Sequence, residues 1–459
     1  MVSATELPGG DDTIVALATA AGHGAIALIR LSGARAIPIV RALGASSLTP
    51  RHATRVVLTH PHGERLDDAL VVWFAAPHSY TGEEVVEIST HGGSVVPALV
   101  LAACVAAGAR LATPGEFTRR AVLNGRMDLV QAEAVADLIN ARTTAMHRQA
   151  LMHLDGGLSR RLNALRHEVI HLEALLAYDI DFPEEDDGPI APRRITEAAA
   201  QLCEALRALI NTAPQGSLLR DGVLVVIAGP PNAGKSSLFN ALLGESRALV
   251  TAIPGTTRDA IEAVLDRTPV PLRFVDTAGL RETDDEIERL GIEVSTRYLG
   301  QARIVLACGS HPDDIAATCH AIGAHTHATV LRVHTKMDLG LAPGSGEDGV
   351  VSVSAETGQG LRELLDAIDR AAAVDAAAHI PSGAAGDGIL ITRERHRAGL
   401  LAALAELTEF LTVWEQGAVP APVAAVHLYA ARESLTELIG IIDTEDVLDR
   451  VFRDFCIGK

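Results

Sequence analysis

The sequence predicts a multidomain protein in which two α/β domains are combined with a domain of long helices. A chain of 459 residues is long enough for about three domains at ~150 residues each. Short β-type runs fill the N-terminal region and give way, after Asp128, to apolar residues spaced three and four apart. Strands and helices alternate from Asp221, and helical periodicity returns at Thr392. The second α/β region therefore interrupts the helical one.

The first domain, expected over residues 1–125, is a small α/β unit. Its β-type runs are separated by turns rich in glycine, proline and histidine. A helix is expected over 94–107, closed by Gly108. The expected strands are 14–18, 25–31, 55–58, 69–74 and 85–89.

The helical domain is expected in two segments, 126–215 and 378–459. One apolar stripe predicts a single packed helix that stops at the acidic, proline-containing stretch 181–187, and a second helix is expected over 195–211. An Ala/Gly-rich linker over 375–388 leads into the second segment. Chain ends that meet at the base of an inserted domain permit this arrangement. The stripe consists of Leu151, Leu154, Leu158, Leu162, Leu165, Val169, Leu172 and Leu176.

Composition limits the cellular setting and the partners. The formal net charge of −19 repels nucleic acid, so any RNA contact needs a local basic patch or a partner's surface. Five scattered cysteines form neither a Cys-x-x-Cys pair nor a zinc spacing, which indicates reduced thiols. The first residues lack the pattern of a signal peptide, and the longest apolar run, 97–109, is too short for a membrane helix. We expect a soluble, cytoplasmic protein without membrane association.

A phosphate-binding loop is predicted in the inserted domain, which is expected over 216–377 with a mostly parallel sheet. The stretch GPPNAGKSS, from Gly229 to Ser237, lies between a buried-strand run and a helical pattern. In such a loop the backbone N–H groups wrap a phosphate at a helix N-terminus. Lys235 is then expected to reach the β- and γ-phosphates, and the Ser236 hydroxyl to ligate Mg²⁺.

Four further segments in the same order predict a guanine nucleotide. Thr256 and Thr257, in GTTRD, are candidates for closing over the γ-phosphate and ligating Mg²⁺. DTAG (276–279) offers an acidic contact to the metal and a glycine N–H. Asp338, in TKMD, can accept two hydrogen bonds from a guanine edge, for which adenine has no matching donors. SAETGQG (354–360) fits the loop that caps the base, and together the five motifs resemble those of translation-factor-like GTPases.

Hydrolysis needs groups beyond these motifs. The position after DTAG holds Leu280, where Ras-like enzymes have a glutamine that orients water. The carbonyl oxygen of the Asn232 side chain, inside the phosphate loop, is placed to hold a monovalent cation that neutralises charge in the transition state. The acidic stretch 282–288 is the next candidate for positioning water.

The whole chain, from Asp12 to Lys459, resembles the MnmE (TrmE) family of tRNA modification GTPases. The resemblance rests on motifs along the full length, including DTIVALAT, IRLSG, SYTGEEVVEI, PGEFTRRAVLNGRMDL, GSLLRDG, TAIPGTTRD, DTAGLRETDDEIERLGI and the terminal FCIGK. It implies a homodimer formed through N-terminal domains that resemble a tetrahydrofolate-binding module and carry a formyl-tetrahydrofolate. Matching motif to motif, the folate would be bound by Arg30, Glu87, Arg126 and Lys459.

The same resemblance implies an activity, further ligands and a partner. A flavoprotein of the MnmG type, which binds FAD, would complete a heterotetramer that adds a carboxymethylaminomethyl group to C5 of the wobble uridine of tRNA. GTP hydrolysis would gate this modification through K⁺-dependent dimerisation of the G domains. Asn232, Thr251, Ile253 and Thr256 would bind K⁺, Glu288 would position the attacking water, and Cys456 would serve the modification. Mg²⁺ would be held by Ser236 and Thr257.

The GTP-binding residues expected from all these motifs form one set, in which Lys235 also acts in catalysis. It comprises Asn232, Ala233, Gly234, Lys235, Ser236, Ser237, Thr251, Ala252, Ile253, Pro254, Gly255, Thr256, Thr257, Asp276, Thr277, Ala278, Gly279, Thr335, Lys336, Asp338, Ser354 and Ala355. Thr335 stands where the guanine-reading motif usually has asparagine, and a hydroxyl replaces only part of an amide's hydrogen bonding.

The alternative is a ribosome-assembly GTPase of the Era/Der type, acting as an RNA-docking switch. Such proteins share the central motifs but carry a basic RNA-binding domain or a tandem G domain. This chain has one phosphate loop and acidic flanks, which favours the first interpretation.

Overall fold

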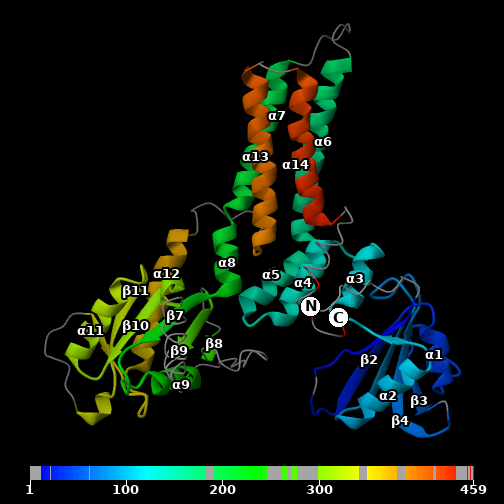
Figure 1. Ribbon diagram of the computed structural model, residues 1–459, viewed down its shortest axis with the longest axis horizontal. Coiled ribbons are helices and arrows are strands. Elements are labelled where there is room, and N and C mark those ends of the chain that lie inside the picture. The colour runs from blue at the N-terminus through cyan, green and yellow to red at the C-terminus, as the bar shows by residue number, and fades with distance from the viewer. Residues whose placement is uncertain are drawn as a thin grey trace, which may run out of the picture. The chain divides into compact units, whose positions relative to one another are not determined.

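A computed structural model describes most of the chain (Figure 1). Its contacts divide the chain into two compact units, Met1–Ala136 with Ile439–Lys459, and Asp137–Leu438. The end of the expected 378–459 segment thus belongs with the N-terminal residues, since Phe452 and Phe455 pack against Leu129 and Ala132. The described residues are 12–20, 22–60, 62–181, 191–245, 261–265, 270–276, 298–340, 349–379, 388–416, 420–440, 452, 455 and 458.

The first unit contains a mixed sheet in the order β3-β4-β5-β2-β1-β6. The five strands expected from the sequence are present, as is the expected helix, here α2 (Val95–Ala106). Three further elements, α1 (Ala36–Ala42), α3 (Glu116–Leu123) and β6, were not predicted, because they are too short to show periodicity. The strands are β1 (Ile14–Leu17), β2 (Ile26–Ser32), β3 (Thr54–Thr59), β4 (Arg65–Phe74), β5 (Val85–His91) and β6 (Arg110–Leu111).

Alternation along β2 and β5 separates a core face from an outer face of this sheet. Ile29 and Leu31 on β2, with Val86 and Ile88 on β5, are fully buried in the cluster that includes α1 and α2. Because successive side chains point to opposite faces of a strand, Arg30 and Glu87 lie on the other face. These two residues are directly paired in the antiparallel register.

The long helices of the second unit correct one expectation. The apolar stripe belongs to two helices, α5 (Thr144–Leu154) and α6 (Gly157–Asp181), separated at Asp155 and Gly156. Gly156 has a φ of 79°, a left-handed conformation that ends α5. The stripe is buried from Leu158 onward, whereas Leu151 is exposed.

Helices from both sides of the inserted segment pack together. α7 (Pro192–Ile210) runs beside α6 and α13 (Glu394–Gln416), and α14 (Ala421–Ile439) joins them (Figure 1). Arg432 on α14 is paired with Glu173 on α6, and Arg166 donates to the Thr436 hydroxyl. The linker expected from residue 375 begins later, because α12 (Leu361–His379) continues through its alanine-rich start.

The inserted segment forms a second sheet, in the order β12-β11-β10-β7-β9-β8. All its described neighbours pair in parallel except β8 and β9, so the sheet is mostly parallel as expected. One core cluster includes α9 (Lys235–Glu245) and α12, and another, on the other face, includes α11 (Pro312–Gly323). The strands are β7 (Val223–Ala228), β8 (Ile261–Leu265), β9 (Leu272–Asp276), β10 (Ile304–Gly309), β11 (Thr329–His334) and β12 (Val350–Ser352).

Within the described residues, no helix is both long enough and apolar enough to cross a bilayer.

Candidate functional site

The phosphate loop follows β7, the strand at which the order of the second sheet reverses. β7 pairs in parallel with β9 on one side and with β10 on the other. In open α/β sheets such a switch point leaves a crevice at the carboxyl ends of the strands. The loop from Gly229 to Gly234 crosses this crevice and ends where α9 begins at Lys235, so a helix N-terminus faces the same space.

The backbone of the loop requires particular residues. A Cβ on Gly229 would lie 2.4 Å from the carbonyl oxygen of Cys308, at the end of β10. Asn232 and Gly234 have φ angles of 62° and 82°, in the left-handed region that glycine and asparagine tolerate best. The absence of a side chain at Gly229 and the left-handed conformations at Asn232 and Gly234 together let the loop turn tightly at the end of the sheet.

The side chains of the loop divide into buried and exposed groups. Lys235 is 8% exposed, and its Nζ donates a hydrogen bond of 2.9 Å to the carbonyl of Pro230. Asn232, Ser236 and Ser237 are exposed. The loop therefore exposes side-chain oxygens to solvent, whereas the ammonium group of Lys235 is folded back against the loop's own backbone.

Thr335 connects the loop to the guanine-reading motif. Its side chain is buried, and Oγ1 lies 2.6 Å from the carbonyl oxygen of Ala233 and 3.1 Å from that of Gly309. Lys336, in a left-handed conformation with a φ of 57°, places its aliphatic stem over Gly234. The hydroxyl at position 335 thus acts on the protein backbone and fastens the phosphate loop to the end of β11.

Asp338 lies in a short 3₁₀ helix, Met337–Leu339, directly after this connection. Oδ1 of its carboxylate accepts a 2.7 Å hydrogen bond from the Ser354 hydroxyl, whose oxygen also accepts from the N–H of Thr357. The N–H of Met337 donates to the carbonyl of Val353. The loop after β12 therefore orients the carboxylate expected to read guanine.

Several predicted site residues lie outside the described residues, so their placement is not part of this geometry. The backbone of Asp276 is described: it ends β9 and is paired in register with Ile227 of β7, beside the phosphate loop. Ala355 follows Ser354 in the loop after β12. The predicted residues outside the described range are Thr251, Ala252, Ile253, Pro254, Gly255, Thr256, Thr257, Thr277, Ala278, Gly279, Glu288, Cys456 and Lys459.

Arg30 and Glu87 form the centre of a second candidate site, on the outer face of the first sheet. Nε and Nη2 of Arg30 donate to Oε1 of Glu87 at 2.9 and 2.7 Å, and neither side chain is more than a quarter exposed. The guanidinium also lies over the rings of Tyr80 and Phe117. Within the described residues nothing donates to Oε2 of Glu87, so that oxygen remains available as an acceptor.

A partly buried ionic network in the same unit was missed by reasoning from the sequence. Arg120 joins Asp12, Glu83 and Glu116, while Arg110 joins Asp12 and Glu116. Burial alone would raise the pKa of Glu116. Hydrogen bonds from Arg110, the Thr113 amide and Arg120 outweigh that effect and lower the pKa to about 2. The sequence signal that could have indicated this network was the clustering of charged residues in the PGEFTRR stretch.

Of the other residues expected in this second site, Arg126 is described by the structure and Lys459 is not. Arg126 is exposed, and its stem lies over Gly82. Gly458, one residue before the end of the chain, lies against the carbonyl oxygen of Leu17, where a Cβ would be 2.3 Å away. Leu17 is paired with Ile29, the neighbour of Arg30. The C-terminal end therefore reaches the strand next to Arg30.

Comparison with known proteins gives concordant results over nearly the whole chain. A family model described as "MnmE helical domain" matches residues 129–456, and one described as "GTP-binding protein TrmE N-terminus" matches 13–126. A protein of Acidovorax sp. named "tRNA modification GTPase MnmE" is 42% identical over 99% of this chain and 100% of its own length. One of the same name from Heliobacterium modesticaldum is 41% identical over 98% and 99%. Among solved structures, the G domain of the T. maritima FeoB iron transporter aligns with 33% of this chain and 98% of its own at 28% identity, with a TM-score of 0.26.

Proposed function

The chain belongs to the MnmE family of tRNA modification GTPases, and on that premise we propose a specific activity for it. It hydrolyses GTP in a K⁺-dependent manner and, with a flavoprotein of the MnmG type, adds a carboxymethylaminomethyl group to C5 of the wobble uridine of tRNA. The observation that carries the nucleotide assignment is the orientation of the Asp338 carboxylate by Ser354, beside a phosphate loop fastened by Thr335. GTP hydrolysis gates the modification.

The exposed oxygens of the phosphate loop support a role in holding cations. The Ser236 hydroxyl at the start of α9 is exposed and, with Thr257, would hold Mg²⁺. Asn232 is exposed on the same loop and would hold K⁺ with Thr251, Ile253 and Thr256. These cations neutralise charge on the phosphates during transfer, and Glu288 would position the attacking water in place of the glutamine absent at Leu280.

The outer face of the first sheet would bind a formyl-tetrahydrofolate. The free Oε2 of Glu87 is suited to accept hydrogen bonds from the N–H groups of a pterin ring, because Arg30 holds the other oxygen. Arg126 and Lys459 would bring positive charge to the carboxylates of the folate. The position of Gly458 beside Leu17 supports docking of the FCIGK end near this face, and would bring Cys456 close to the chemistry.

The remaining assignments concern assembly. We propose that two copies associate through their N-terminal domains and form a heterotetramer with the flavoprotein in the cytoplasm, where tRNA is the substrate. The ribosome-assembly alternative is not favoured, because the curated relatives that match the full chain are named tRNA modification GTPases.

The proposed activity is tested by analysis of wobble nucleosides in tRNA from a strain that lacks this chain. Loss of the carboxymethylaminomethyl uridine, with restoration by the wild-type chain, is the expected result. Mass spectrometry of nucleosides after complete digestion measures it directly. An unchanged nucleoside profile in the deletion strain, with altered ribosomal subunit profiles, would instead support the ribosome-assembly alternative.

A variant of the C-terminal motif separates hydrolysis from modification. Cys456→Ser should hydrolyse GTP like the wild type and fail to restore the modified uridine, since a thiolate is far more accessible near neutral pH than an alkoxide. Thermal melting serves as the folding control. Full restoration of the nucleoside by this variant would assign Cys456 to packing.

A further inference from the structure

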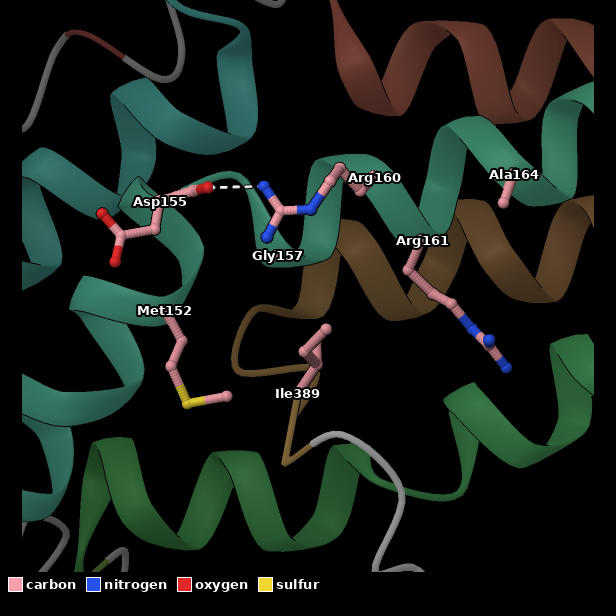
Figure 2. Close-up of a pocket in the computed structure, with 7 residues that line it drawn as sticks. All are labelled: Met152, Asp155, Gly157, Arg160, Arg161, Ala164 and Ile389. Carbon is pink, nitrogen blue, oxygen red and sulfur yellow. Dashed lines mark hydrogen bonds between the residues drawn. The ribbon is translucent and has the colours of Figure 1, made fainter.

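A cleft at the junction of α5 and α6 has the character of an anion site. Its volume is about 460 Å³, and it is lined by Met152, Asp155, Gly157, Arg160, Arg161, Ala164 and Ile389. Figure 2 shows the two arginines extending from the first turns of α6, with Met152 and Ile389 nearby. None of its lining residues belongs to the phosphate loop or to the Arg30 and Glu87 site.

The floor of the cleft is apolar and closely packed. Gly157, the first residue of α6, approaches Ile389 so closely that a Cβ would lie 3.4 Å from Cδ1. A Cβ on Gly388 would lie 3.3 Å from Cε of Met152. The small side chain of Ala164 is exposed and leaves the upper part of the cleft open.

The two guanidinium groups supply the positive charge of the cleft. Within the described part of the chain, no carboxylate lies within ion-pair distance of Arg160 or Arg161. Nη1 of Arg160 donates to the backbone carbonyl of Asp155 at 2.7 Å, while the Asp155 carboxylate points away from it (Figure 2). Arg160 is therefore held in place and keeps its remaining N–H donors free. The N-terminus of α6 adds a favourable dipole for an anion.

The charge around the cleft departs from that of the whole chain. Residues 142–171 contain five arginines and four histidines but only two carboxylates, in a chain with a net charge of −19. An acidic protein that acts on RNA needs a local basic surface to offset its overall repulsion. Further along α6, His167 and His171 are exposed, and so is Glu168, one of the two carboxylates.

We propose that this cleft binds the phosphate backbone of tRNA, with Arg160 and Arg161 each contacting a phosphate. This inference rests on the tRNA substrate of the proposed function. Arginine is suited to the role because its planar donors match phosphate oxygens. Contacts of this kind position an RNA without reading its sequence.

The test compares two double variants of the full chain that remove equal charge. Arg160→Gln with Arg161→Gln empties the cleft of cations. Arg193→Gln with Arg207→Gln is the matched control, because those arginines are on α7 and are already paired with Glu197 and Glu204. Affinity for a tRNA transcript is measured by fluorescence anisotropy across a KCl series, without nucleotide or partner.

The cleft variant should bind tRNA roughly tenfold more weakly at low salt, and the slope of log K against log [KCl] should fall by about 2, one for each lost phosphate contact. The control should change affinity by less than about twofold. Ala164→Glu, which places a carboxylate in the cleft at an exposed position, should weaken binding in the same way. GTP hydrolysis by all three variants should match the wild type.

Equal losses in the cleft and control variants would overturn the proposal, since total charge would then explain them. Unchanged tRNA affinity in both cleft variants would overturn it too, and a concurrent loss of flavoprotein binding would reassign the cleft to a protein. Restoration of the modified uridine by the wild-type chain tests the proposed function separately. The anisotropy comparison decides the role of the cleft whichever way that complementation ends.

Discussion

In the nucleotide site, two hydroxyl side chains serve mainly to position other groups of the protein. Thr335 shows this most clearly, because its hydroxyl is directed at two backbone carbonyls of neighbouring segments. Ser354 acts on Asp338 in a similar way. Its hydroxyl donates to one carboxylate oxygen, and this hydrogen bond fixes the orientation of the whole carboxylate. Both depend on a hydroxyl that sits within hydrogen-bond reach of a group far away in the sequence.

The carboxylate of Asp338 is expected to select the base. Asp338→Asn should weaken GTP binding by about a thousandfold and shift the preference to xanthosine triphosphate, because an amide has only one acceptor oxygen for the two guanine donors. Ser354→Ala should weaken GTP binding only several-fold, by the ~1 kcal/mol that one orienting hydrogen bond contributes. Equilibrium titration with fluorescent nucleotides measures both. Tight GTP binding by Asp338→Asn would contradict the assignment.

Glu116 should make the stability of the first unit depend on pH in the acid range. Its folded-state pKa of about 2 lies below the ordinary 4.5, so its stabilising contribution is complete above about pH 4.5. The contribution is lost as the pH falls from there toward 2, and totals about 3 kcal/mol. Glu116→Gln should destabilise the unit at pH 7 by about 3 kcal/mol and flatten this pH dependence.

Tryptophan fluorescence can follow this unit alone. The chain has two tryptophans: Trp73 lies on β4, whereas Trp414 lies on α13 and stacks on Phe410. In a Trp414→Phe background, urea unfolding at pH 7, 4 and 3 reports on the unit that contains Glu116. An equally steep acid loss in Glu116→Gln would assign the effect to other carboxylates.

Elements in the second unit are tied together where the inserted segment begins and ends. The N–H of Ile391 donates to the Thr212 hydroxyl, just before α8 (Ala213–Asp221), which leads into β7. Nε2 of His153 on α5 lies 2.9 Å from the carbonyl oxygen of Leu390. The chain that returns from the inserted segment is therefore held between two helices.

The returning chain also passes very close to the backbone of Gly216 on α8. A Cβ there would lie 2.1 Å from the carbonyl oxygen of Ile391, and backbone cannot yield as a flexible side chain does. Gly216→Ala should lower stability by about 1–3 kcal/mol. Gly323→Ala, at the end of α11 with nothing within 4 Å, is the control and should be neutral or slightly stabilising. Calorimetry of the full chain compares them, and equal melting of both variants would refute the close approach.

At the scale of the whole molecule, the candidate chemistry is divided between the two units. The nucleotide site and the arginine cleft belong to the second unit, and the face with Arg30 and Glu87 belongs to the first. The proposed gating requires the nucleotide cycle of the second unit to influence the chemistry proposed for the first. In the proposed mechanism, binding of a monovalent cation at Asn232 provides the signal. On this proposal, the entire cycle depends on the cation.

Hydrolysis should therefore be much faster in KCl than in NaCl, since the oxygens around Asn232 would fit an ion about as large as K⁺ and not the smaller Na⁺. Rb⁺ and NH₄⁺ should substitute for K⁺. Phosphate release at matched ionic strength measures the effect, with Asn232→Ala as the variant that should lose the difference between salts. Equal rates in KCl and NaCl for the wild type would exclude a specific cation.

Local patterns in the sequence determined much of this protein. The phosphate loop, the guanine-reading motif, the strands of the first sheet and the long helices are each encoded within short stretches, by periodicity or by residues needed at fixed spacing. The family was also recognisable from motifs alone. The predictions of strands, helices and family are confirmed, because hydrogen bonding within a turn, and burial of one face of an element, depend on neighbours in the sequence.

Only the tertiary structure decided which distant groups meet. The break at Gly156 interrupts an apolar stripe that continues unchanged across it. The ionic network joins Asp12 to Arg120, and the Thr335 hydroxyl is directed at the carbonyl of Ala233. The cleft of Arg160 and Arg161 needs Ile389 as its floor. Each of these depends on contacts between residues far apart in the chain, whose partners are chosen by packing and desolvation of the folded whole.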